Sequence, residues 1–163
     1  MVVKEYKPKE IGDGVWHTEK INKETMGNLF QRAKAGDIDL LKNSDVDKTY
    51  GITKITPLHM LARNAQEGKE EIIKHPSVDK VSTEKGITPL HILANRGVDR
   101  VLDHLSVAKV KDWDGNTPLH LLARAGSEKA LTHPEATRVY NGANKTPKDL
   151  FKKPITEGGE RYQ

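Results

Sequence analysis

A phrase of about ten residues recurs along this chain at nearly constant intervals. It reads TPLHMLARNA from Thr56, TPLHILANRG from Thr88 and TPLHLLARAG from Thr117, and a shorter copy, TPKDLFKK, begins at Thr146. The opening threonines are 32, 29 and 29 residues apart. Because a fixed period of about 20 to 50 residues is typical of repeat architectures, this spacing constrains the fold more than any other feature.

A further copy precedes these four. GNLFQRAKAG aligns with TPLHLLARAG and puts Gly27 in the position of the threonine, 29 residues before Thr56. The second half of the unit repeats as well, starting from Gly36, Gly68, Gly97 and Gly126. The sequence therefore predicts about five units, of which the more polar first unit and the truncated last unit act as caps.

Each unit begins with the residue types that start a helix. Threonine is a good N-cap, and proline fits the first turn, where its missing N–H has no partner. In the copy from Thr117, Leu119, Leu122 and Ala123 share one face of a short helix that ends at Gly126. We expect a second helix of about two turns, ended by Pro76 or Pro134 in two units, and then an extended turn.

Helices this short are marginal in water, so neighbouring units must stack and bury their leucine faces together. Equivalent residues, such as Leu58, Leu90 and Leu119, should line one interior. The prediction is an all-α, helix-turn-helix repeat solenoid with short β-turn or hairpin connections.

The stretch from Asp112, DWDGNTPLHLLARAG, resembles the ankyrin repeat, and the resemblance extends over roughly residues 23–153. The family period is about 33 residues. The 29-residue units here therefore imply a shorter second helix. Gly86 and Gly115 hold the position two before the threonine, where a left-handed backbone is expected, but Lys54 and Asn144 replace them in two units. The turn at Lys54 is thus the one that departs most from the pattern.

Catalytic and metal-binding motifs are missing from the sequence. Six of the seven histidines recur in register, three in TPLH and three at the end of the second half, which favours a structural role. The chain has no cysteine and no HExxH, GxSxG or phosphate-binding GxxxxGK[ST] motif. We predict a protein that is not an enzyme and that uses no metal or cofactor.

Composition narrows the partners and the compartment. Without cysteine, a long apolar stretch or a secretory signal, a cytoplasmic protein without a membrane span is expected. Lys and Arg outnumber Asp and Glu by 27 to 23, which favours an acidic partner. A monomer is the default.

The resemblance implies that partners lie against the turn tips and the exposed positions of the first helix, which together form a concave face. The tip residues are Ile52, Thr53, Ile55, Glu84, Lys85, Ile87, Trp113, Asp114 and Asn116. Seven or eight residues after each threonine position lies a cation, and these five form what we call the basic stripe: Lys34, Arg63, Arg96, Arg124 and Lys153. Trp113 either contacts the partner or folds back on the neighbouring tip.

The leading functional hypothesis is a protein-protein interaction module that binds another protein, with an acidic face, through the tips and the basic stripe. Nucleic-acid binding through the same stripe, or a structural role in a larger assembly, are the alternatives; scarce aromatic residues weaken the former. Residues 24–153 form the expected repeat array, and residues 154–163 a C-terminal tail. The extension over residues 1–23 is either a hairpin packed on the first unit, which we favour because Val15 and Trp16 are apolar, or a partner-binding arm.

Overall fold

A computed structural model describes residues 23–49 and 51–153 of the chain. The described residues contain α-helices and short 3-10 helices, and no strand. The α-helices are α1 (Lys23–Lys34), α2 (Pro57–Asn64), α3 (Lys69–Lys74), α4 (Pro89–Asn95), α5 (Pro118–Arg124) and α6 (Pro147–Leu150). The 3-10 helices are η1 (Ile38–Lys42), η2 (Asp99–Asp103) and η3 (Lys129–Thr132). The hairpin or arm expected before α1 and the C-terminal tail lie outside the described residues.

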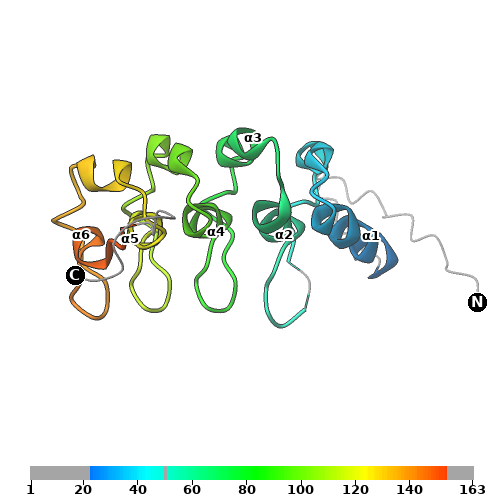
Figure 1. The fold of residues 1–163 in the computed structure, drawn as a ribbon. Coiled ribbons are helices and arrows are strands. Elements are labelled where there is room, and N and C mark those ends of the chain that lie inside the picture. The colour runs from blue at the N-terminus through cyan, green and yellow to red at the C-terminus, as the bar shows by residue number, and fades with distance from the viewer. Residues whose placement is uncertain (1–22, 50, 154–163) are drawn as a thin grey trace, which may run out of the picture.

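The helices fall into two layers, as Figure 1 shows. We call α1, α2, α4, α5 and α6 the first helices; they stand side by side in chain order, and each packs against the next. The second helices, η1, α3, η2 and η3, lie along one side of this row, and long loops extend on the opposite side (Figure 1). The all-α class is confirmed for the described part of the chain.

The Thr-Pro helix starts are confirmed in atomic detail. Oγ1 of Thr56 accepts a hydrogen bond from the backbone N–H of His59 at 3.2 Å, and the imidazole Nδ1 accepts from the N–H of Thr56 at 3.1 Å. This reciprocal capping box, with proline at the first helical position, recurs at Thr88 and Thr117. At Thr146, the carboxylate of Asp149 replaces the imidazole. Each cap satisfies backbone donors that a helix otherwise leaves without partners.

Most of the second helices are 3-10 helices of about one and a half turns. Three of them are 3-10 helices of four or five residues, and only α3 is an α-helix. In the unit of α4, Gly97 ends the first helix, so the chain has few residues left to reach the second layer. A 3-10 helix rises about 2.0 Å per residue and covers that distance with fewer residues. The unit of α2 has three more residues between its two helices, and these extra residues reach the second layer. Gly68 is then the N-cap of α3.

Equivalent leucines form one continuous interior, as expected. Leu58, Leu90 and Leu119 are completely buried, and so are the leucines three residues after each of them. Backbone bonds join neighbouring units at the same place: the N–H of Leu90, for example, donates to the carbonyl of Val78 at 3.1 Å. A neighbour thus completes both the core and the hydrogen bonding of each unit.

The connections between units are turns without regular strands. Thr83 N–H donates to the carbonyl of Ile87, and the equivalent bond closes the loops at Asp112 and Asn141. The position two before the threonine is left-handed in every loop: φ is +54° at Lys54, +75° at Gly86, +76° at Gly115 and +57° at Asn144. The predicted conformation is confirmed, and Lys54 adopts it without the freedom of glycine.

Candidate partner-binding surface

The four loops that precede α2, α4, α5 and α6 form the edge on which the tip residues lie. We call them the tip loops: residues 51–55, 83–87, 112–116 and 141–145. Backbone hydrogen bonds join each tip loop to the next, from Glu84 N–H to the carbonyl of Thr53 (3.1 Å), from Trp113 N–H to Lys85 (3.0 Å) and from Gly142 N–H to Asp114 (2.7 Å). The tips are therefore linked parts of one surface.

Trp113 lies at the third of these tips with 78% of its surface exposed. The backbone around it is fixed, because the carboxylate of Asp112 accepts from the N–H of Asp114 at 3.0 Å and of Asn116 at 2.9 Å. The edge of the indole ring approaches Gly86 of the preceding loop, where a Cβ atom would lie 3.3 Å from Cδ1. The ring thus touches the neighbouring tip at one edge and leaves most of its surface open.

The other predicted tip residues divide into exposed and buried ones. Ile52 is 89% exposed, and Glu84, Lys85 and Asp114 are also exposed, whereas Ile87 is half-buried. Asn116 is only 7% exposed, so its prediction as a contact residue was wrong. Its side-chain Oδ1 accepts from Nδ2 of Asn141 at 2.8 Å, and its backbone carbonyl accepts from His91. Asn116 joins two loops instead of facing a partner.

The basic stripe is less regular than the sequence suggests. Lys34, Arg63, Arg124 and Lys153 are exposed, and none forms an ion pair with another described residue. Arg96 is half-buried, and its Nη1 donates to the carbonyl of Ala62 in the last turn of α2 at 2.8 Å. Arg96 occupies the eighth position after its threonine and not the seventh, and from there it reaches the preceding helix. The stripe is interrupted at the unit of α4.

The sequence pattern did not identify several apolar residues that lie at the surface. The fourth position after the threonine is half-buried at Met60 and Ile92, on the same helix face as Arg63 and Arg96, which follow three and four residues later. This spacing of three or four residues was the signal that could have found them. Tyr140 is 49% exposed beside the last tip loop, and Leu105 is 85% exposed where two other units have proline. No periodic signal identified these two.

The histidines of the TPLH phrase link one unit to the next. Nε2 of His59 lies 2.9 Å from the carbonyl oxygen of Ile87, and His91 and His120 make the same contact with Asn116 and Lys145. Because a carbonyl oxygen only accepts, Nε2 carries the hydrogen and Nδ1 is the acceptor. Burial lowers the pKa of all three imidazoles, and the hydrogen bond to the carbonyl opposes this shift only partly.

The other three repeated histidines stabilise the turn after the second helix. Nδ1 of His75 accepts from the N–H of Ser77 at 3.1 Å, and the same bond occurs from Ser106 to His104 and from Glu135 to His133. Within residues 23–49 and 51–153, no three histidine or acidic side chains come together as a metal site requires.

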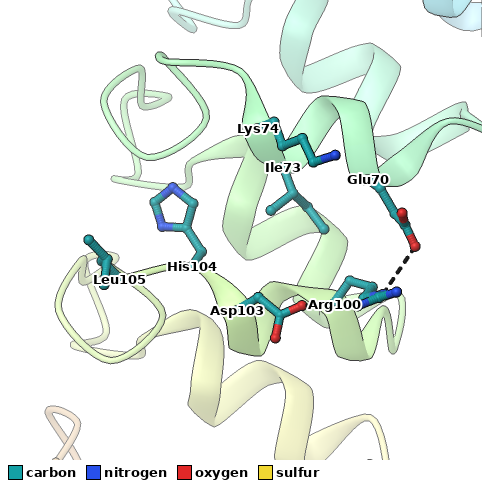
Figure 2. Close-up of a pocket in the computed structure, with 7 residues that line it drawn as sticks. All are labelled: Glu70, Ile73, Lys74, Arg100, Asp103, His104 and Leu105. Atoms are coloured by element: carbon teal, nitrogen blue, oxygen red, sulfur yellow. Dashed lines mark hydrogen bonds and ion pairs between the residues drawn. The ribbon is translucent and has the colours of Figure 1, made fainter.

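One hollow of about 620 Å³ lies between α3 and η2, on the side away from the tip loops. Figure 2 shows Arg100 turned toward Glu70 across its rim, with Nε and Oε1 3.0 Å apart. The same guanidinium also reaches Asp103 at 3.3 Å. Ile73 and Leu105 supply apolar lining. Three of its charged groups, Glu70, Arg100 and Asp103, already pair with one another, so we assign it no reaction.

A search with models of known protein families and a search among curated proteins each gave no match to this chain. Among the described residues, every helix is too short or too polar to cross a bilayer.

Proposed function

We propose that this chain is a short-period member of the ankyrin-repeat type, a repeat solenoid that binds another protein through its tip loops and basic stripe without catalysing a reaction. Three in-register TPLH phrases and reciprocal Thr–His caps support the family assignment. The stacking of equivalent leucines supports the solenoid. The engagement of the repeated histidines in backbone hydrogen bonds supports a structural role for them in place of a catalytic one.

Trp113 is the observation that carries the binding proposal. Trp113 is 78% exposed, so its large apolar ring is in contact with water in the free protein. This contact is unfavourable, and a partner that covers the ring would remove it. The N–H of Trp113 donates to the carbonyl of Lys85 in the preceding tip loop, and the next residue, Asp114, bonds to Asp112 and accepts from Gly142 of the following loop. These bonds hold the backbone at Trp113, so a partner would not have to order it. Tryptophan and arginine are the residues most enriched among those that dominate interface energies.

The charges in the last turns of the first helices favour a partner with an acidic face. Arg63 and Arg124 have no ion-pair partner among the described residues, so a carboxylate from outside would not displace an existing bond. Exposed ion pairs contribute little affinity each, but same-sign charges along one face speed association with an acidic surface.

The test is affinity capture from the cells that make this protein, followed by measurement of Kd with the purified partner. We expect Trp113→Ala to weaken binding by about 2 kcal/mol, or roughly thirtyfold. Leu105→Ala is the matched control, because it removes an equally exposed apolar side chain on the opposite side of the array.

Other outcomes distinguish the alternatives. Unchanged Kd in the Trp113→Ala variant would reject the tip surface. A nucleic acid as the captured partner, with log affinity falling steeply against log salt, would favour nucleic-acid binding. Recovery only as a subunit of a large complex that both variants leave intact would favour the structural role.

A further inference from the structure

Nearly every position that is constant between units has a structural task in the array. The threonines cap helices, the prolines start them, the leucines fill the interior and the histidines bridge to the next unit. One constant position has none. Eight residues before each opening threonine lies a cation, and we call these four residues the loop-entry row: Lys48, Lys80, Lys109 and Arg138.

All four side chains of the loop-entry row are exposed. None makes a side-chain hydrogen bond or an ion pair with another described residue, whereas Arg96 of the basic stripe is committed to a carbonyl. The array therefore gives no internal reason for a cation at this position in every unit. The other exposed positions vary in charge; the one four residues before the threonine holds Ile52, Glu84, Trp113 and Gly142.

The backbone under this row is anchored on both sides. The residue two before each cation is buried: Val46, Val78, Val107 and Ala136. The residue after the cation packs partly on the core at Val81, Val110 and Val139. Since packed helices in neighbouring units lie about 10 Å apart, successive cations repeat at roughly that interval. The row thus presents a fixed series of positive charges over roughly 30 Å.

The field of the row should be strongest toward its C-terminal end. Asp47 and Asp79 precede the first two cations, and each carboxylate accepts a 2.6 Å bond from a serine of the next unit. Ala108 and Thr137 occupy that position before Lys109 and Arg138. Lys111 adds a further cation there, with Nζ 3.1 Å from the carbonyl oxygen of Tyr140.

We propose that the loop-entry row binds an extended acidic segment of a partner protein, with a carboxylate at about every third residue. A chain in the polyproline II conformation has three residues per turn and rises about 3.1 Å per residue, so every third side chain lies on the same face. These side chains repeat at about 9.3 Å, close to the spacing of one cation per unit. A nucleic acid fits less well, because duplex DNA carries one charge per about 1.7 Å of axis and would leave most phosphates unpaired. This inference does not depend on the tip surface around Trp113.

Two synthetic peptides of identical composition test the register. One is four repeats of Glu-Ser-Ser; the other has its four glutamates consecutive, followed by eight serines. Binding to the full-length protein is followed by NMR titration at low ionic strength. We expect the spaced peptide to bind at least about threefold more tightly and to shift signals of the loop-entry row.

The matched variants carry the same change in net charge. Lys48→Gln, Lys80→Gln, Lys109→Gln and Arg138→Gln together should weaken binding of the spaced peptide by about tenfold, as expected for four exposed ion pairs. The control replaces Lys69, Lys74, Lys148 and Lys152 with Gln and should keep the affinity within about twofold. Thermal melts should shift by no more than about 2 °C, because these four side chains make no hydrogen bond or ion pair with another described residue.

Three results would overturn the proposal. The first is equal binding of the two peptides, and the second is equal loss in the two variants, since either would indicate unspecific attraction. The third is tighter binding of a twelve-nucleotide oligothymidylate than of the spaced peptide, lost in the row variant, which would assign the row to nucleic acid.

Discussion

Nε2 of His91 lies 2.9 Å from the carbonyl oxygen of Asn116, twenty-five residues later, and donates a hydrogen bond that joins one unit to the tip loop of the next. Nδ1 of the same ring accepts from the N–H of Thr88 at 3.2 Å. One neutral imidazole therefore caps its own helix and holds the neighbouring loop. The stability of the array and the shape of its tips depend on the same side chains.

The first prediction concerns pH. Burial lowers the pKa of His59, His91 and His120 in the folded protein below the ordinary value of 6.5, so the unfolded chain binds more protons on the acid side of that value. These residues should contribute full stability above about pH 6.5, and stability should fall as the pH drops below it. The slope should reach up to about 1.4 kcal/mol per pH unit for each histidine. Urea unfolding at pH 7.5, 6.5 and 5.5 measures it; a flat profile would contradict the assignment.

The second prediction separates the two classes of histidine. His91→Ala should cost about 3 kcal/mol, because it leaves a cavity and removes the partners of a buried N–H and a buried carbonyl. His104→Ala, at a half-buried position with one backbone bond, should cost about 1 kcal/mol. The midpoints of denaturant unfolding compare the stabilities of the two variants. Equal losses of stability would contradict the bridging role of His91.

The third prediction concerns the left-handed turn position. Lys54 adopts φ +54°, so Lys54→Gly should stabilise the protein by about 1 kcal/mol. Gly115→Ala is the control with the opposite expected sign. Gly115 has φ +76°, and an added Cβ would lie 2.6 Å from the backbone nitrogen of Gly142. We expect this change to cost about 2 kcal/mol. Differential scanning calorimetry checks both signs, and a destabilised Lys54→Gly variant would refute the reasoning.

The fourth prediction concerns a serine–aspartate hydrogen bond that one pair of neighbouring units lacks. Ser77 and Ser106 each donate to an aspartate of the preceding unit at 2.6 Å, but the next equivalent pair is Glu135 and Ala108. Combining Ala108→Asp with Glu135→Ser should give a favourable coupling of about 1 kcal/mol. A double-mutant cycle in urea measures this energy. Simple additivity of the two changes would mean that the serine bonds do not stabilise the junction.

The sequence was sufficient for features that depend on local chemistry repeated at a fixed period. Thr-Pro predicted the helix starts, and the leucine spacing predicted the interior, because caps and apolar faces are determined within one unit. The roles of Arg96 and Asn116 were not predictable in this way, since their partners lie in neighbouring units. The 3-10 form of most second helices also depends on the distance the chain must cover between two layers.

The most direct test of the pre-organised tip surface is amide hydrogen exchange of the free protein by NMR. The N–H groups of Glu84, Trp113 and Gly142 bridge adjacent tip loops, so we expect them to exchange at least about a hundredfold more slowly than an unstructured chain. The exposed side chains of Ile52 and Trp113 give no protection of their own. Exchange of these three amides at the rate of an unfolded peptide would contradict the account, because a partner would then meet flexible loops and not a fixed surface.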